Sequence, residues 1–337
     1  MGRLSCSLTI AVLALLVVAG CGTKGSNERS AGLQIGLVFD VGGLGDKSFN
    51  DSAYQGLLRA RDSLRVGIEY LEPAEGTDRE AALRQMAAGR PGLIFGIGAL
   101  FTDDIRAVAN EFPDKRFACI DYAWQEGVEV PPNVLGLKFR EQEGCFLVGA
   151  IAGMVTQTNA VGFVGGMDNA LIHKFEAGYR AGVRAVNPDC QVLVAYAGVT
   201  ANAYKDPAKG KELALAQYDA GADIIFHASG STGLGVFEAA RDRDRLAIGV
   251  DADQQSEAPG HILTSMIKRV DVAIFETVRA VMKGSFAGGI HEVGLAEASL
   301  DYVYDEANRR WITPEIHSRV EALRADVLAG RISVPTE

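Results

Sequence analysis

The alternation of short apolar runs with helical patterns is the feature that most constrains the fold of this 337-residue chain. Runs of this length, rich in Val, Ile, Leu and Phe, are typical of buried strands. They predict strands near residues 35–39, 66–71, 92–97, 117–121, 134–139, 160–165, 191–197, 223–227, 246–250 and 261–264. Strands that alternate with helices form parallel sheets with helices on both faces. Because the series occurs twice, we predict an α/β fold of two Rossmann-like lobes.

The helical patterns between the strands complete the two lobes. They predict helices near residues 52–64, 78–88, 102–111, 143–156, 173–186, 209–220, 233–241, 270–282 and 313–330, whereas residues 292–304 alternate like a strand pair. We assign residues 33–139 and about 265–290 to the first lobe, and residues 140–264 and about 291–337 to the second. Connections that cross between lobes form a hinge, so we expect the lobes to move relative to each other.

The N-terminus has the pattern of a secretory leader. Residues 1–20 contain Arg3 and then an apolar run that is too short to span a bilayer comfortably. The run ends in Val18-Ala-Gly-Cys21, which resembles the bacterial lipobox, although leucine is commoner than valine at its first position. We therefore expect Cys21 to carry lipid such as palmitate and to anchor the protein to a membrane in the cell envelope, on the extracytoplasmic side, with residues 21–32 as a flexible tether. Ordinary cleavage without lipid is the alternative.

Composition argues against nucleic acid as a partner, because the formal net charge is -10 and the pI is about 5.1. Beyond the leader and the lipid site, the chain has Cys119, Cys145 and Cys190, which stand in apolar stretches without metal-site spacing. We expect them to be buried and unpaired. The five histidines are scattered as well. We predict neither a metal site nor a cofactor.

A glycine-rich loop follows the first predicted strand and carries Asp40, Asp46, Phe49, Asn50 and Asp51. A phosphate loop needs glycine where this chain has Asp46, and the three aspartates would repel a phosphate. Carboxylates accept hydrogen bonds and aromatic rings stack on flat apolar surfaces, so the loop suits a neutral or cationic small molecule. In the alternative, the glycines only make a turn and Asn50 or Asp51 caps the following helix.

Polar residues also follow later strands, at the edge where open α/β sheets bind ligands. Asp121 ends the fourth predicted strand, Asp251 follows the strand near residue 248, and Lys268 comes after the last strand. The carboxylates could accept hydrogen bonds from sugar hydroxyls, and Lys268 could donate to a ring or hydroxyl oxygen. Phe49 and Phe226, from opposite lobes, could hold a planar base between them. The structural alternatives are helix caps for the aspartates, a solvated lysine and a core phenylalanine.

The sequence shows no catalytic constellation. A hydrolase needs a nucleophile or a paired acid and base, and no Ser/His or Cys/His arrangement or nucleophile elbow stands out. Asp40, Asp46 and Asp51 resemble the aspartates that hold calcium in nucleoside hydrolases, so a metal-dependent nucleoside hydrolase is kept as an alternative. We predict a protein that is not an enzyme and that captures its ligand between two lobes.

Five segments resemble the signature segments of the basic membrane protein family, the purine nucleoside receptor A-like lipoproteins. They are Asp40-Val-Gly-Gly-Leu-Gly-Asp-Lys-Ser-Phe-Asn50, Gly162-Phe-Val-Gly-Gly-Met-Asp168, Phe175-Glu-Ala-Gly-Tyr-Arg-Ala-Gly182, Ile248-Gly-Val-Asp-Ala-Asp-Gln254 and Thr264-Ser-Met-Ile-Lys-Arg269. The segments occur in the family's order, and the similarity covers essentially the whole mature chain. The resemblance implies a type I periplasmic-binding-protein fold that serves an ABC importer, with a membrane permease as its partner.

The resemblance also implies roles for individual residues. In relatives that bind purine nucleosides, two phenylalanines stack on the base, an aspartate and an asparagine read its edge, and aspartates with a lysine hold the ribose. The matching positions are Phe49 and Phe226 for stacking, Asp40 and Asn50 for the base edge, and Asp121, Gly249, Asp251 and Lys268 for the ribose. This chain departs from the pattern at Asn169-Ala170, where relatives commonly have proline.

Three hypotheses follow. The first is a monomeric, lipid-anchored substrate-binding protein of an ABC importer, which binds purine nucleosides by hinge closure. The second is a binding protein of the same fold for a simple sugar or a signalling molecule. The third is the metal-dependent nucleoside hydrolase.

Overall fold

The structure is a computed structural model that describes residues 1–2, 32–73 and 78–337. The lipidation site predicted at Cys21, nearly all of the predicted leader and the tether up to residue 31 lie outside the described residues. Within the described part of the chain, no helix combines the length and the apolar character that crossing a membrane requires.

The first lobe is built on a six-stranded sheet with the order β11-β5-β4-β3-β1-β2. Every neighbouring pair in this sheet is parallel. Its strands are β1 Gln34–Val38, β2 Gly67–Leu71, β3 Leu93–Ile97, β4 Arg116–Ile120, β5 Val134–Phe139 and β11 Gly289–Val293. The central strand β3 is buried along its whole length, as expected for a parallel sheet covered on both faces.

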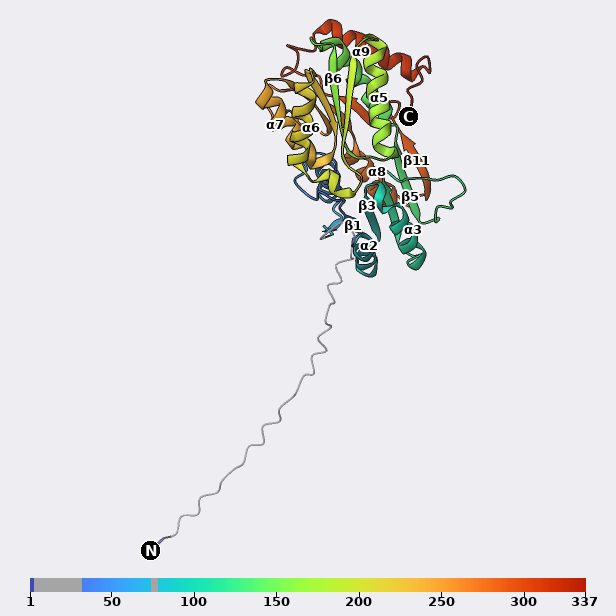
Figure 1. Cartoon of the computed structure of the whole chain (residues 1–337). Coiled ribbons are helices and arrows are strands. Elements are labelled where there is room, and N and C mark those ends of the chain that lie inside the picture. The colour runs from blue at the N-terminus through green and yellow to red at the C-terminus, as the bar shows by residue number, and fades with distance from the viewer. Residues whose placement is uncertain (3–31, 74–77) are drawn as a thin grey trace. The chain divides into compact units, whose positions relative to one another are not determined.

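The second lobe repeats this plan with the strand order β12-β10-β9-β8-β6-β7. Its strands are β6 Ala160–Met167, β7 Gln191–Gly198, β8 Ile224–Ala228, β9 Leu246–Asp251, β10 Ile262–Lys268 and β12 Leu300–Tyr302. The edge strand β12 runs antiparallel to β10, and the other pairs are parallel. The predicted α/β fold of two parallel-sheet lobes is confirmed (Figure 1).

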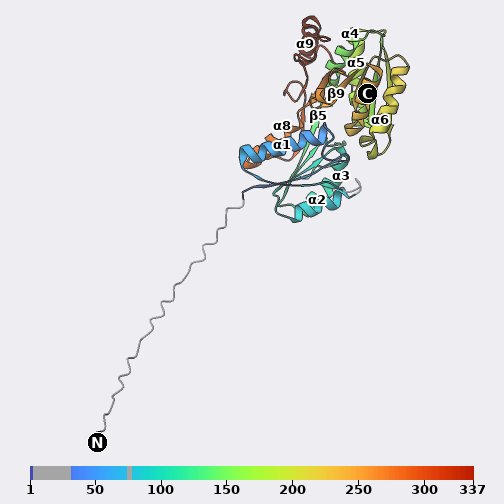
Figure 2. The ribbon, with the colours of Figure 1, turned by 90° about the vertical axis from the view of Figure 1, so that its left-hand side faces the viewer.

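Helices cover both faces of each sheet. In the first lobe, α1 Phe49–Leu64 and α8 Val270–Met282 lie on one face, and α2 Arg79–Ala88 and α3 Thr102–Glu111 lie on the other (Figure 2). In the second lobe, α5 Ala170–Val186 packs with α4 Glu141–Val155 on one face, opposite the pair α6 Pro207–Asp219 and α7 Gly233–Arg243. The last helix, α9 Pro314–Leu328, packs against α4. Short 3-10 turns follow strands at η1 Ala99–Phe101, η2 Ala201–Tyr204, η3 Gly230–Thr232 and η4 Gln255–Glu257.

Glycines bring α4 and α5 into direct backbone contact. A Cβ at Gly178 would lie 2.3 Å from the Gln142 carbonyl oxygen, and one at Gly182 would lie 2.0 Å from the Phe146 carbonyl oxygen. Distances this short leave no room for a methyl group. The small residues of the sequence therefore mark a tight helix pair in the second lobe.

The chain passes between the lobes three times, after β5, after β10 and after β11. The second crossing falls after Lys268, because β10 pairs with β9 as far as residue 267, slightly beyond the expected position near 265. The prediction that residues 292–304 form a pair of strands is wrong, because the two strands here do not pair with each other. β11 pairs with β5 in the first sheet, and β12 pairs with β10 in the second. Cys119, Cys145 and Cys190 are buried and unpaired, as predicted.

Candidate functional site

A cavity lies between the lobes at the carboxyl ends of the strands and contains about 680 Å³ of space outside protein atoms, part of it open to solvent. The first lobe contributes the loop after β1, the turn after β3 and the end of β4, and the second lobe contributes the matching ends of β6, β8, β9 and β10. Six of the eight predicted ligand-binding residues line it: Asp40, Phe49, Asn50, Asp121, Asp251 and Lys268.

The glycine-rich loop is held in shape by its own side chains. The buried carboxylate of Asp46 accepts hydrogen bonds from the backbone N–H groups of Ser48, Asn50 and Asp51 and from the Asn50 side-chain amide. The Asn50 carbonyl oxygen in turn accepts a bond from the Asp40 N–H at 3.1 Å. Asn50 therefore lines the cavity and also holds the loop in shape. The free N–H groups at the start of α1 are accepted by Asp46, and not by Asn50 or Asp51, the capping residues considered from the sequence.

Asp40 places in the cavity wall a carboxyl group that is a weaker acid than an ordinary aspartate, with a raised pKa. One of its oxygens accepts the Val41 N–H at 2.7 Å. The other lies against Gly98, where the backbone has φ +110° and an added Cβ would come within 2.2 Å of it. Burial raises the pKa of Asp40 to about 7, although the Val41 hydrogen bond and the charge of Arg79 oppose the shift. This group can change its protonation state near neutral pH.

Asp121 and Asp251 occupy corresponding places in the two lobes. Asp121 follows β4 and Asp251 ends β9, and both have left-handed backbones, with φ of 61° and 66°. Aspartate is one of the few residues with a side chain that adopts this conformation readily. Burial raises the pKa of Asp251 to about 7, while Lys268 and a hydrogen bond from Ser48 oppose the shift. Each lobe thus presents one carboxyl group to the cavity from the end of a strand.

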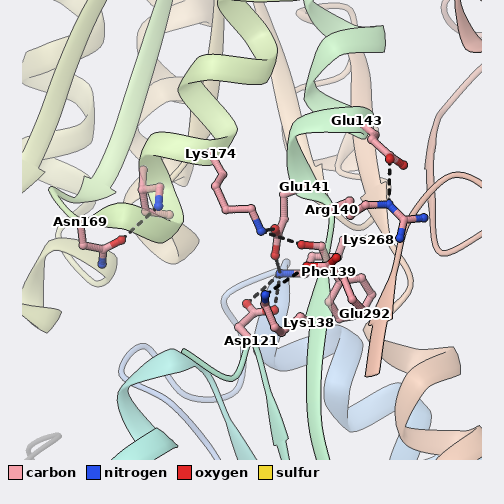
Figure 3. Close-up of polar contacts among 11 residues, drawn as sticks. Asp121, Lys138, Phe139, Arg140, Glu141, Glu143, Asn169, Lys174, Lys268 and Glu292 are labelled. Atoms are coloured by element: carbon pink, nitrogen blue, oxygen red, sulfur yellow. Dashed lines mark hydrogen bonds and ion pairs between the residues drawn. The ribbon is translucent and has the colours of Figure 1, made fainter. Parts of the chain in front are cut away.

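Lys268 is almost completely buried and bonds to three carboxylate oxygens (Figure 3). Its ammonium lies 2.7 Å from both oxygens of Asp121 and 3.1 Å from Glu141 Oε1. Burial alone would lower the pKa of Lys268, but the neighbouring carboxylates, Asp121 first, raise it above its ordinary value. The lysine is therefore a fixed cation in the cavity wall. The alternative that Lys268 is a solvated surface lysine is excluded.

Two further hydrogen bonds join the lobes beside the cavity. Ser48 Oγ, in the first lobe, donates to Asp251 Oδ2 at 2.6 Å, and Gln254 Nε2, in the second, donates to the Lys47 carbonyl at 3.0 Å. Gln254 is itself anchored, because its Oε1 accepts the Val250 N–H at 2.8 Å and lies 3.1 Å from His227 Nε2. The lobes are thus in direct polar contact around the cavity.

The structure does not place Phe226 or Gly249 in the cavity wall. Phe226 is fully buried, with its ring centroid 5.7 Å from that of Phe163 and 5.3 Å from that of Tyr179. The predicted stacking position of Phe226 is therefore wrong, because its side chain points from the middle of β8 into the helix layer. Gly249 also lies within its strand, where an added Cβ would come 2.5 Å from Ser265 Oγ. It makes room for packing behind the site.

Sequence reasoning missed two aromatic residues that line the cavity from the second lobe. Tyr204 lies in η2, before α6, and Phe175 lies in α5. Together with Phe49 they give the cavity wall three aromatic residues. A signal was available for Phe175, because it is the first residue of one of the five signature segments, although its place in an amphipathic helix is equally typical of a core residue. Tyr204 stands in an irregular segment that neither strand nor helix periodicity marks.

The chemistry of the wall favours a ligand with donors and a flat ring. Among the described residues that line the cavity, four aspartates stand beside a single lysine. Carboxylates accept hydrogen bonds from hydroxyl and N–H groups, and rings stack on planar groups. Within the described residues, no group of three or more His, Cys, Asp or Glu side chains is arranged so that it could hold a metal ion.

Comparison with known proteins gives consistent matches along the chain. A family profile described as "ABC transporter substrate-binding protein PnrA-like" matches residues 34–336. The ABC transporter nucleoside-binding protein BmpA of Lactococcus lactis is 31% identical over 356 residues, which cover 97% of each chain. An uncharacterized lipoprotein of Pyrococcus abyssi is 35% identical over 320 residues, which cover 90% of this chain and 77% of the relative. An ABC transporter solute-binding protein from Aeropyrum pernix has a TM-score of 0.82 at 30% identity, with 90% of this chain and 94% of that chain covered.

Proposed function

Because this chain belongs to the family of PnrA-like ABC transporter substrate-binding proteins, we propose that it captures purine nucleosides in its cavity and delivers them to a membrane permease. Its type I periplasmic-binding-protein fold, implied by the resemblance, is confirmed by the solved structures that it matches. Proteins of this family bind and present a ligand, and they are typically not enzymes.

The observation that carries the proposal is the pairing of aromatic rings with carboxylates in one cavity. Phe49 and Tyr204 come from opposite lobes and supply faces on which a base can stack. Asp121 and Asp251 supply acceptors for hydroxyl groups. A nucleoside joins a flat ring to a hydroxyl-rich sugar, so it matches both halves of the site. The name of the Lactococcus relative supports the same ligand class.

The base edge is assigned to Asp40 and Asn50, which lie side by side in the first-lobe part of the wall. A carboxylate accepts hydrogen bonds from ring N–H groups, and the Asn50 amide keeps one N–H beyond the bond that it donates to Asp46. Phosphorylated ligands fit poorly, because four aspartates would surround an added negative charge.

The place of action is the cell envelope. Cys21 would hold the protein on a membrane through lipid, and the related Pyrococcus protein is named as a lipoprotein. From that position the closed, loaded form would present surfaces of both lobes to the permease. Labelling the expressed protein with a radioactive fatty acid tests the anchor, with Cys21→Ser as the control that should take up no label.

Calorimetric titration of the purified full-length chain tests the ligand. Guanosine, inosine and adenosine should bind with one ligand per chain, whereas ribose, glucose and free hypoxanthine should bind more weakly. Binding of a simple sugar in place of nucleosides would favour the second hypothesis of the same fold. Chromatography of the bound ligand should recover intact nucleoside, and release of free base would point to a hydrolase.

A further inference from the structure

A row of four charges of alternating sign runs from the cavity into the second lobe (Figure 3). Asp121 bonds to Lys268, Lys268 bonds to Glu141, and Glu141 bonds to Lys174. Asp121 and Lys268 line the cavity, but Glu141 and Lys174 do not. Contact with a ligand therefore does not explain the inner pair.

The position of the Lys268 ammonium is fixed from several sides. An ammonium group has three N–H donors, and three carboxylate oxygens, two from Asp121 and one from Glu141, lie within 2.7–3.1 Å of it. The rings of Phe139, Phe49 and Phe175 also surround it, with centroids 4.8, 5.2 and 5.6 Å away. Lys268 thus has no donor left for a ligand while these bonds hold.

Asp121, in contrast, keeps acceptor capacity. Each carboxylate oxygen can accept about two hydrogen bonds, and the Lys268 ammonium uses one on each. The remaining lone pairs are available to hydroxyl groups in the cavity. The Lys268 ammonium sets the directions in which these lone pairs point. If Lys268 moved toward a ligand oxygen, its bonds to Asp121 and to Glu141 would both change.

Glu141 holds Lys268 from the side away from Asp121, and Lys174 holds Glu141. The Lys174 ammonium lies 2.5 Å from Glu141 Oε2 and 2.7 Å from the Phe139 carbonyl oxygen. Glu141 is almost completely buried, at 1% exposed. Burial acts to raise the pKa of Glu141, but Lys268 and Lys174 together hold it below its ordinary value. Glu141 and Lys174 thus form an ion pair in which both side chains are held by further hydrogen bonds.

We propose that Glu141, held by Lys174, is a positioning residue that keeps Lys268 on Asp121 and so orients the Asp121 oxygens for the sugar hydroxyls of the ligand. This inference rests on the proposed function and deepens it. It assigns recognition of the hydroxyl groups to a pair of residues outside the cavity. A purely structural ion pair would affect stability without changing which part of the ligand is recognised.

The test compares each nucleoside with its 2′,3′-dideoxy counterpart, by calorimetry on the full-length chain. The measured quantity is the affinity for the nucleoside divided by the affinity for its dideoxy counterpart, for inosine, adenosine and guanosine. In Glu141→Gln this ratio should fall about tenfold, which corresponds to about 1.4 kcal/mol of lost coupling. Glu143→Gln is the matched control: it lies on the same helix, pairs with Arg140 at 2.7 Å and stands outside the cavity wall, so the ratio should not change.

The double variant Glu141→Gln/Lys174→Met separates positioning from stability. It removes the partly buried positive charge that Glu141→Gln leaves without its carboxylate partner, so its melting temperature should rise above that of the single variant. Its affinity ratio should stay low, because the uncharged Gln amide oxygen holds the Lys268 ammonium less strongly than the Glu141 carboxylate does. If the single variant does not fold, the double variant alone supplies the ratio.

Two results would overturn the positioning role while leaving the proposed function intact. One is a wild-type protein that binds nucleosides and their dideoxy counterparts equally well. The other is a double variant in which the affinity ratio recovers together with the melting temperature. A wild-type protein that binds none of the three nucleosides would instead refute the proposed function, and the positioning role with it.

Discussion

Both carboxylate oxygens of Asp121 lie 2.7 Å from the ammonium of Lys268, and the two residues belong to different lobes. The pair is buried, with side chains 5% and 1% exposed. Neither charge is therefore left unpaired between the lobes. The floor of the cavity is an ion pair that joins the first lobe to the second.

Replacing Lys268 by methionine should destabilise the protein strongly. The change leaves the buried carboxylates of Asp121 and Glu141 without their shared ammonium, and breaking a buried ion pair costs about 3–5 kcal/mol. Urea unfolding measures the loss. Lys138→Met is the control, because its pair with Glu292 is partly exposed and should contribute less than about 1 kcal/mol. Equal losses in both variants would contradict the expected cost of the buried charges.

Stability should fall as the pH rises from about 4 to about 7. Burial raises the pKa of Asp40 and of Asp251 from 3.8 to about 7, so the folded protein keeps two protons that the unfolded chain loses early in this window. The stabilisation is complete below pH 3.8 and is lost as the pH rises through about 7. Asp40→Asn and Asp251→Asn should each flatten the decline in urea unfolding, and asparagine also accepts the left-handed backbone of residue 251. An unchanged slope in both variants would contradict the assignment.

Nucleoside affinity should change with pH in the opposite direction. Hydrogen-bond donors of the ligand favour the ionised forms of Asp40 and Asp251, so binding should tighten as the pH rises through about 7 and should release protons below it. Calorimetry in buffers of different ionisation enthalpy counts the protons. Asp40→Asn should reduce the number released. Proton uptake on binding would show that these groups serve the ligand as acids.

Tyr204 and Phe226 should respond to substitution in different ways. Tyr204→Ala removes a ring from the cavity wall and should weaken nucleoside binding by about 1–3 kcal/mol. Phe226→Leu disturbs a buried ring cluster and should lower stability by about 1–2 kcal/mol while leaving affinity nearly unchanged. Titration and urea unfolding on both variants give the comparison. A large loss of affinity in Phe226→Leu would restore the stacking role first assigned to it.

Ser48→Ala should make the bound ligand leave faster. Ser48 Oγ donates a hydrogen bond across the lobes to Asp251 Oδ2 at 2.6 Å. The change removes this bond and leaves a buried carboxyl oxygen of Asp251 without its donor, which weakens the closed form. Stopped-flow dissociation should show a several-fold increase in rate. Ser52→Ala is the control, since Ser52 Oγ accepts the Asp271 N–H at 3.3 Å within the first lobe and should leave the rate unchanged. Identical rates in both variants would remove Ser48 from the closing contacts.

The sequence predicted the elements of the fold closely because both lobes consist of strands buried on both faces. The expected strand at residues 134–139 matches β5 as it stands, and the helix expected at 270–282 matches α8. Turn signals and apolar runs mark such elements without tertiary information. Partnership between strands is a tertiary property, so the pattern in residues 292–304 did not reveal that its two strands join different sheets.

Site residues were predictable where they follow a strand, as Asp121 and Asp251 do, because strand ends in parallel sheets converge at one edge. Phe226 was misplaced because periodicity in a doubly covered strand does not tell which side chains reach the cavity. Glu141 was missed for a different reason. An acidic residue in the first turn of a helix is common, and only the packing of α4 beside β10 shows that its partner is Lys268.

The close contact of α4 and α5 sets how far apart Glu141 and Lys174 stand. Gly178 lies one turn after Lys174, and its missing side chain lets the helix rest on the carbonyl of Gln142, the neighbour of Glu141. A methyl group at residue 178 would act as a spacer between the two helices and pull the lysine away from its carboxylate. In the proposed positioning role, recognition of a sugar at the far end of the charge row would depend on a position that carries no side chain at all.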